Sequence, residues 1–276
     1  MDACCSHPVR ATRRRHLFVI PDLKKLYRPQ ERNAMRIASL LILGVLMQLA
    51  TIPAVRAGDA AELEILGFSK DGGVFAFEEY GVQDGSGFPY SNRYYIDTKT
   101  DKFLPGTPIR ARIEDENVTL EAARQQAREG GEKIITQADL AANRGFTAGF
   151  NPVTELSADP FRMAVNPRPV FPPIDPPVEF RLEEIRLDGA EICASQGDIK
   201  GFRLLRIDAR PGGETQLLHE DKSIPQSRRC PFGYLIGGVQ TLSSRAGLIS
   251  YAVLIVVRQY GFEGPDHRWI AVTGRF

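Results

Sequence analysis

A hydrophobic segment near the start of the chain determines which residues remain to fold and in which compartment they do so. Residues 35–57 (MRIASLLILGVLMQLATIPAVRA) combine Arg36, an apolar run over 37–50 and an ending in small residues at Ala57. This order is that of a secretory signal peptide. The apolar run has 14 residues, whereas a spanning helix needs about 20. We therefore expect cleavage after Ala57, a periplasmic or secreted product, and no stable membrane span after cleavage.

The signal follows a basic leader, residues 1–34, that carries eight Lys or Arg against three acidic residues. Translation that begins at Met35 would remove it from the native protein. Alternatively, the leader is a long disordered n-region or a cytoplasmic tail on an uncleaved anchor, and the positive-inside rule then still places everything after Ala57 outside the cytoplasm. A basic arm for nucleic acid conflicts with an export signal directly downstream.

The remaining chain, residues 58–276, is mildly acidic. The first 57 residues hold 10 basic and 3 acidic residues, which leaves 25 basic and 31 acidic residues and a net charge of −6 after them. Such a domain lacks the positive field that nucleic acid or anionic lipid requires. Its 219 residues suffice for one domain or two small ones.

Two cysteines remain after cleavage, Cys193 and Cys230. An even pair in an oxidising compartment predicts a disulfide. Closing this loop would stabilise the fold by about 3–4 kcal/mol in the chain-entropy model. The alternative is two buried thiols, while a redox-active pair would normally be spaced Cys-x-x-Cys.

Residues 61–104 predict a β-meander. Short strands rich in apolar and aromatic residues alternate with turns that contain Asp and Gly. The expected strands are 62–68, 74–80, 93–97 and one that starts at 102–104.

One ordered set of residues stands out in this stretch: Phe68, Ser69, Asp71, Gly72, Ala76, Phe77, Tyr94, Tyr95, Ile96, Asp97 and Thr98. In these residues the stretch resembles one blade of the TolB-type β-propeller family. In that family the aspartate and glycine form the turn between the first two strands and are structural. A propeller needs several blades, and the pattern occurs once, so we expect a blade-like sheet and not a full propeller.

The middle of the chain differs in character. Good helix formers occupy 119–142, interrupted by Gly130-Gly131, with Thr136 suited to be the N-cap of a second helix. Residues 151–177 contain eight prolines, which exclude a regular helix and a central strand. We expect this Pro-rich connector to join a first unit, 58–150, to a second, 178–276.

The second unit is also expected to be β. Its predicted strands are 180–187, 202–208, 215–219, 234–241 and 248–259. The last is apolar enough to be a central strand. The predicted fold class is therefore mainly β with a short helical insertion, built from antiparallel meanders, with two related β units as one arrangement.

A weak internal repeat supports two related units. Val74–Asp97 and Val253–Val272 each contain an apolar strand, Tyr-Gly, a polar loop and an Arg-aromatic pair. If the repeat is real, each segment forms an antiparallel hairpin. Phe77 would then lie near Tyr95 in the first, and Val257 near Ile270 in the second. Chance similarity of two hairpins is the alternative.

The two repeated loops hold the candidate binding residues. If the loops are adjacent in space, they form an acidic mouth rimmed by Phe88, Tyr90 and Trp269 that would suit a cation, a sugar or a peptide. The alternative is ordinary turn chemistry, with aromatic rings that pack the strand ends. The candidate residues are Glu78, Glu79, Asp84, Glu263, Asp266, His267 and Trp269.

No motif in the sequence predicts catalysis. Only His219 and His267 remain after the signal, and no zinc motif, nucleophile elbow or phosphate loop is present. His219-Glu220-Asp221 is expected to be the solvated end of a hairpin. We expect no catalytic residues, no metal and no cofactor. The predicted function is a non-catalytic envelope module that binds an envelope protein or wall component. A hydrolase-like enzyme that uses the acidic loops is the alternative.

Four further stretches span most of the chain after the signal: ILGFSKDGGVFAFEEYGVQDGSGFPYS (65–91), FRLLRID (202–208), LLHEDKSIPQSRRCP (217–231) and VVRQYGFEGPDHRW (256–269). In these stretches the chain resembles an uncharacterised family of predicted secreted proteins from Gram-negative, chiefly alphaproteobacterial, species. This resemblance implies the compartment and the boundaries, and no activity. The basic leader lies outside the family's usual pattern, which favours a start at Met35.

Overall fold

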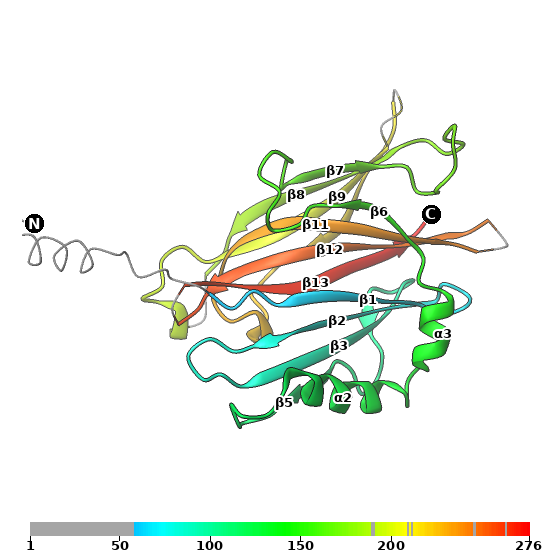
Figure 1. Cartoon of the computed structure of the whole chain (residues 1–276). Helices are drawn as coiled ribbons and strands as arrows, with labels where there is room; N and C mark the ends of the chain where they lie inside the picture. Colours follow the sequence, from blue (N-terminus) through cyan, green and yellow to red (C-terminus); the bar gives the residue numbers. More distant parts are fainter. Residues whose placement is uncertain (1–57, 189–190, 209, 211, 245–246, 263) are drawn as a thin grey trace, which may run out of the picture. The chain divides into compact units, whose positions relative to one another are not determined.

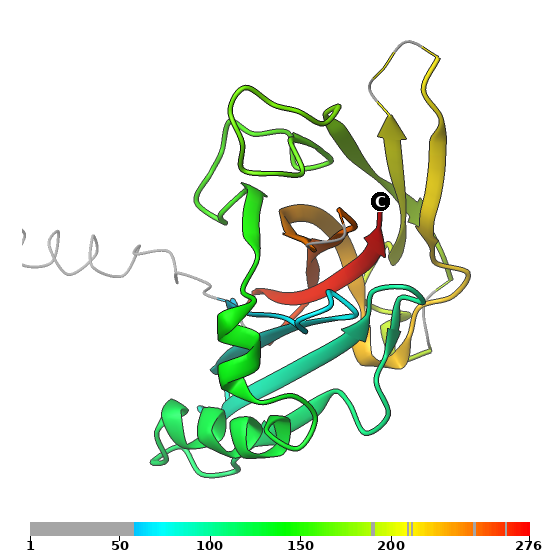
Figure 2. The same ribbon diagram turned by 90° about the vertical axis from the view of Figure 1, so that its right-hand side faces the viewer.

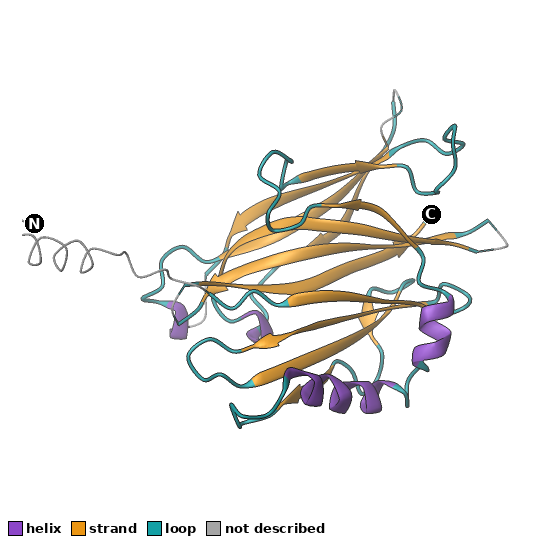
Figure 3. Cartoon of the chain, in the orientation of Figure 1, coloured by secondary structure: helices purple, strands orange, loops and turns teal. Residues whose placement is uncertain are grey.

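Three antiparallel β-sheets and two α-helices make up the part of the chain that the computed structural model describes (Figures 1 and 3). The predicted signal and leader lie outside it. The described residues are 58–188, 191–208, 210, 212–244, 247–262 and 264–276.

The first sheet is the predicted meander, with order β1-β2-β3-β4 and β5 paired to β3. The turn after β1 depends on Asp71, whose Oδ1 accepts hydrogen bonds from Ser69 Oγ (2.6 Å) and the Gly73 N–H (2.9 Å). Gly72 has φ +71° there, which explains the glycine. The strands are β1 (Glu62–Phe68), β2 (Val74–Val82), β3 (Pro89–Asp97), β4 (Lys102–Phe103) and β5 (Ile109–Arg112).

The other two sheets are built from the second half of the chain. The central sheet has the order β13-β12-β11-β6, and the third sheet the order β10-β9-β8-β7. The central strands are β6 (Phe146–Phe150), β11 (Pro231–Ser243), β12 (Ile249–Tyr260) and β13 (Pro265–Arg275). The third sheet contains β7 (Arg162–Val165), β8 (Val178–Arg186), β9 (Lys200–Asp208) and β10 (Thr215–Glu220).

β12 is buried on both faces, as its apolar sequence predicted. Val253 and Ile255 pack with Phe180 and other residues of the third sheet, whereas Leu254 packs against Phe77 of the first. The two sets alternate along the strand because successive side chains point to opposite faces. The central sheet therefore lies between the other two, and β13 is its edge strand on one side (Figure 2).

The helices cover the outer face of the first sheet. α2 (Leu120–Gly131) buries Ala123 and Ala127, and α3 (Gln137–Ala142) buries Leu140. The predicted N-cap is confirmed: the Thr136 hydroxyl accepts a hydrogen bond from the Asp139 N–H at 3.1 Å.

The two regions that the sequence predicts as separate units contribute strands to the same sheet. β6, at the end of 58–150, pairs with β11 of the region 178–276. The Pro-rich connector, 151–177, contains only the short edge strand β7 in regular structure, paired to β8. This position agrees with the argument that prolines exclude a helix or a central strand there.

Both predicted hairpins form, but their registers differ from the expectation. Phe77 lies opposite Tyr94, with ring centroids 4.6 Å apart, and not opposite Tyr95. In the second hairpin Ile270 lies opposite Ile255, two residues from the expected Val257. A shift of one residue moves a side chain to the other face of the sheet. Tyr95 therefore packs toward the helices with Leu140 and Leu66.

The predicted disulfide is confirmed. Cys193 and Cys230 are bonded, with Cα atoms 5.5 Å apart. Both are buried and pack with Ile199 in a small apolar cluster apart from the main core. The bond joins the segment before β9 to the start of β11.

Candidate functional site

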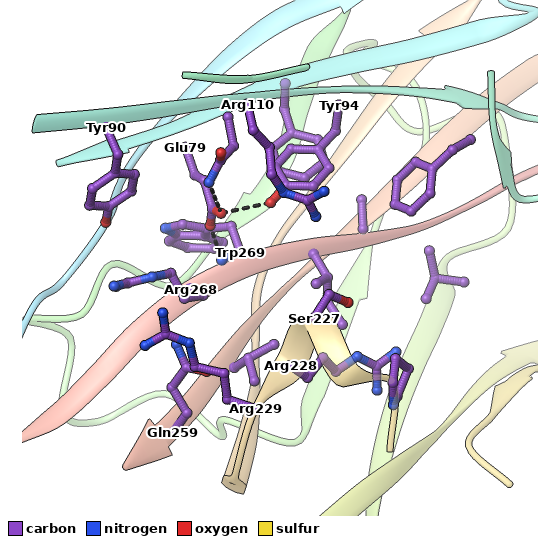
Figure 4. A pocket seen from close by; sticks show the side chains of 18 of the residues that line it. Glu79, Tyr90, Tyr94, Arg110, Ser227, Arg228, Arg229, Gln259, Arg268 and Trp269 are labelled. Carbon is purple, nitrogen blue, oxygen red and sulfur yellow. Dashed lines mark hydrogen bonds between the residues drawn. The ribbon is translucent and has the colours of Figure 1, made fainter. Parts of the chain in front are cut away.

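A cleft of about 580 Å³ runs along the free edge of β13. This volume is within the usual range for small-ligand sites. β2, β3 and β5 form one wall, and residues 225–229 with Phe202 and His219 form the other. Figure 4 shows Glu79, Tyr94 and Arg110 on one side of β13 and Ser227, Arg228 and Arg229 on the other. The residues that line the cleft include Glu79, Tyr90, Tyr94, Asp101, Phe103, Arg110, Arg112, Phe202, His219, Arg228, Arg229, Arg268, Trp269 and Ala271.

Two carboxylates cap the edge of β13. Glu79 Oε2 accepts a hydrogen bond from the Trp269 N–H, and Asp101 Oδ1 accepts one from the Thr273 N–H, both at 2.7 Å. An uncapped edge would expose these donors to pairing with other chains. The two carboxylates therefore occupy backbone donors of this edge that an added strand would otherwise pair with.

Glu79 is held rigidly in its place. Its Oε1 accepts hydrogen bonds from the Tyr94 hydroxyl (2.7 Å) and the Asn92 amide (3.0 Å), and the residue is 3% exposed. Burial, and then the charge of Glu79, raise the pKa of Tyr94 well above its usual value, so the phenol stays a donor. A carboxylate with three donors has little capacity left for a ligand.

Asp101 lies at the other end of the cleft. Burial raises the pKa of Asp101 although hydrogen bonds from Thr273 oppose the shift. His219 lies close enough to Asp101 for its charge to lower the pKa of that carboxyl group. The His219 ring stacks on Phe202, with centroids 4.6 Å apart, and its Nε2 is 3.0 Å from Asp221 Oδ1. His219 is thus fixed in the wall and not free at a hairpin tip as expected.

Five arginines line the cleft, three of them with acidic partners outside it. Arg268 pairs with Asp59 at 2.6 Å, Arg228 pairs with Asp221 at 2.6 Å, and Arg112 pairs with Glu114. Arg110 and Arg229 are exposed and form no ion pair within the described part of the chain. They lie on opposite walls. The cleft therefore offers two uncompensated guanidinium groups to an anion.

Aromatic rings supply the apolar surface of the cleft. Tyr94 stacks on Phe77 and lies 5.9 Å from the ring of Phe103, which is 53% exposed. The Arg268 guanidinium lies 5.1 Å from the centre of the Tyr90 ring. An anionic ligand with an apolar portion would contact both kinds of surface.

Strand alternation separates Glu78 from Glu79, two of the predicted binding residues. Glu79 faces the edge of β13 and lines the cleft, which Trp269 of β13 also lines. Glu78 points to the opposite face, where it pairs with Arg93 and Arg124 beneath α2, each at 2.8 Å. Neighbouring residues of a strand always face opposite sides of the sheet. Glu78 is therefore part of the scaffold under the helix.

The two repeated loops do converge. A Cβ atom at Gly85 in the first loop would lie 3.0 Å from the Phe262 ring in the second. Asp84 belongs to the first of these loops. Glu263 lies outside the described residues.

Asp266 and His267 lie behind the cleft, where the segment before β1 packs on β13. Asp266 Oδ1 accepts a hydrogen bond from the Asp59 N–H at 3.1 Å. The His267 backbone pairs with Asp59 and Ala61 at 2.9 and 3.0 Å. Burial, and then the charge of Arg258, lower the pKa of His267, whose Nδ1 is buried without a partner. These contacts tie the segment before β1 to the edge strand.

Sequence reasoning missed the arginines of the walls. Arg110 and Arg112 are two residues apart, the spacing that places side chains on one face of a strand, and this spacing is the one sequence signal that points to them. Arg228 ends a short 3-10 helix (Gln226–Arg228) and Arg229 follows it, next to Cys230. No sequence pattern there predicts that the two arginines face β13. No group of three or more His, Cys, Asp or Glu among the described residues is arranged to hold a metal ion.

Comparisons with known proteins give a family without an assigned activity. No curated protein and no solved structure matches the chain. Within the described ranges, no helix has the length and apolar character needed to cross a bilayer. The model of one family, described as "Predicted secreted protein (DUF2259)", matches residues 76–275, and thus the cleft with both of its walls. The chain therefore belongs to the DUF2259 family of predicted secreted proteins.

Proposed function

We propose that this protein is a non-catalytic binding module of the cell envelope, and that its cleft along β13 binds an anionic ligand. The observation that carries the proposal is the pair of unpaired guanidinium groups, Arg110 and Arg229, on opposite walls of one cleft. Hydrogen bonds between ionised partners contribute about 1.5–3 kcal/mol each. The ligand would be part of an envelope protein or a wall component.

A secreted hydrolase that uses acidic loop residues is the less well supported alternative. Glu79 and Asp101 are the acidic residues that line the cleft. Both already accept hydrogen bonds from the β13 backbone. The two N–H groups that they bind are four residues apart, or about 14 Å along a strand, wider than the roughly 5–9.5 Å between paired glycosidase carboxylates. These features favour binding over hydrolysis.

Export to the periplasm or beyond is part of the proposal. The family description and the segment 35–57 support it. We expect the exported protein to begin near Gly58, because cleavage follows the small residues at the end of that segment. N-terminal sequencing of periplasmic material would check this. Intact protein in the cytoplasm with residues 1–34 attached would contradict it.

Charge reversal in the cleft should strongly weaken ligand binding. We expect Arg110→Glu/Arg229→Glu to weaken binding of an acidic probe about 100-fold, because two attractive contacts become repulsive. Fluorescence anisotropy would measure the affinity for labelled hepta-glutamate and for a labelled oligogalacturonate. Inorganic phosphate would be tested as a competitor of both. Binding should also weaken as salt rises from 50 to about 300 mM.

The matched control reverses two charges away from the cleft. Lys70→Glu/Lys133→Glu changes the net charge equally at two exposed positions that do not line it. Affinity should then stay within about twofold of the original protein. Equal losses in both double variants would mean that only overall charge matters, and the cleft proposal would fail. The cleft proposal would also be refuted if hepta-glutamate, oligogalacturonate and inorganic phosphate all failed to bind.

A further inference from the structure

Between His267 and Thr273, the outward-facing N–H groups of β13 are capped at every position but one. The β12–β13 ladder runs without a register shift from Tyr260↔Pro265 to Ser250↔Arg275. In such a ladder the N–H and C=O of every second residue point away from the partner. At 267, 269 and 273 the outward N–H binds Asp59 O, Glu79 and Asp101, respectively. Ala271 belongs to the same alternation.

Ala271 therefore has the open N–H in this stretch of the edge. Its N–H and C=O point away from β12, and no described group forms a hydrogen bond with either of them. Ala271 lines the cleft. A donor and an acceptor on one residue of an edge strand are the groups through which an added antiparallel strand pairs.

The arginines lie where the side chains of an added strand would point. Successive side chains of such a strand alternate between the two faces of the central sheet. On one face they would meet Arg110 and Arg112, and on the other Arg228 and Arg229. We propose that the ligand of the cleft is an extended acidic segment of a partner protein that adds to β13 at Ala271. This inference rests on the function proposed above.

The carboxylate caps limit how far the added strand can pair. Trp269 and Thr273 flank Ala271 and already donate to Glu79 and Asp101. Backbone pairing is thus confined to a window of about 14 Å, too short for a long strand to form a continuous ladder. Selectivity then depends on the acidic side chains and their contacts with the two arginine walls.

Amide exchange at Ala271 tests the backbone contact. In the exported protein labelled with ¹⁵N, saturating hepta-glutamate should slow exchange of the Ala271 N–H at least tenfold. The N–H groups of Trp269 and Thr273 are bonded before and after binding, so they serve as internal controls and should change by less than threefold. Unchanged exchange at Ala271, with binding that still depends on Arg110 and Arg229, would overturn strand addition and leave the proposed function standing.

A peptide with blocked amides separates backbone pairing from charge. Fully N-methylated hepta-glutamate keeps every carboxylate but has no backbone donor, so we expect at least a tenfold loss of affinity. Ala271→Pro should give a similar loss for the unmodified peptide, since proline removes the protein's donor at an edge position that tolerates it. Equal affinity for both peptides, or tighter binding of oligogalacturonate than of hepta-glutamate, would overturn the peptide assignment. The exchange experiment decides the question if the proline variant does not fold.

Discussion

Replacing Glu78 by leucine should lower the free energy of unfolding by about 3–5 kcal/mol, the usual cost of breaking a buried ion pair by removing one partner. The Glu78 side chain is fully buried and accepts hydrogen bonds from Ser91 (3.0 Å), Arg93 (2.8 Å) and Arg124 (2.8 Å). Without it, Arg93, whose side chain is 3% exposed, becomes a buried charge without a carboxylate. Urea unfolding at pH 7, monitored by circular dichroism, would measure the loss.

A surface acid of the same helix–sheet region provides the control. Glu121 pairs with Arg128 at 3.2 Å, but its side chain is 62% exposed. Glu121→Gln should therefore change stability by less than about 1 kcal/mol, as exposed ion pairs do. A loss below about 1 kcal/mol for Glu78→Leu would show that the ion pair under α2 does not stabilise the fold.

Removing the disulfide should cost about 2–5 kcal/mol, the range found for native disulfides of secreted domains. Cys193 and Cys230 are 37 residues apart in sequence, so the reduced unfolded chain gains the freedom of that loop. Serine at these buried positions would also leave hydroxyl groups with little access to water. The free energies of unfolding of the oxidised protein and of Cys193→Ser/Cys230→Ser should be compared in urea.

The bond itself can be checked by mass. Protein purified from the periplasm without reductant should have a mass two hydrogens below that of the dithiol form, as one disulfide requires. Reduction of the original protein should reproduce the stability of the double serine variant to within about 1 kcal/mol. Two alkylatable thiols in native material would contradict the assignment.

Local patterns in the sequence predicted most of the strands and the disulfide. The turn at Asp71-Gly72, the N-cap at Thr136 and the apolar β12 each depend on neighbours along the chain, and each is present in the structure. Register was less predictable. The one-residue error that placed Tyr95 beside Phe77 arose because a loop's length does not by itself fix which residues pair across it.

The cleft could not be predicted because it depends on contacts between distant segments. Glu79 and Trp269 were named as candidates, but what brings them together is a hydrogen bond across 190 residues of sequence. Arg110 lies in β5 of the first sheet and Arg229 lies just before β11 of the central sheet, and the two residues share no sequence motif. Most of the predicted binding residues are acidic, whereas the unpaired charged groups in the cleft are basic. The acidic side chains of the cleft already accept hydrogen bonds from the β13 backbone, and Glu78 forms an ion pair with a buried arginine.

Chemical-shift mapping tests most directly whether the cleft is the binding site. ¹⁵N-labelled exported protein would be titrated with hepta-glutamate and the amide shifts followed. The largest changes should occur along β13 at 269–272, in β5 at 110–112 and at 227–229, and they should vanish in Arg110→Glu/Arg229→Glu. Changes that concentrate elsewhere, for example on the exposed face of α2, or that persist in the double variant, would contradict the account.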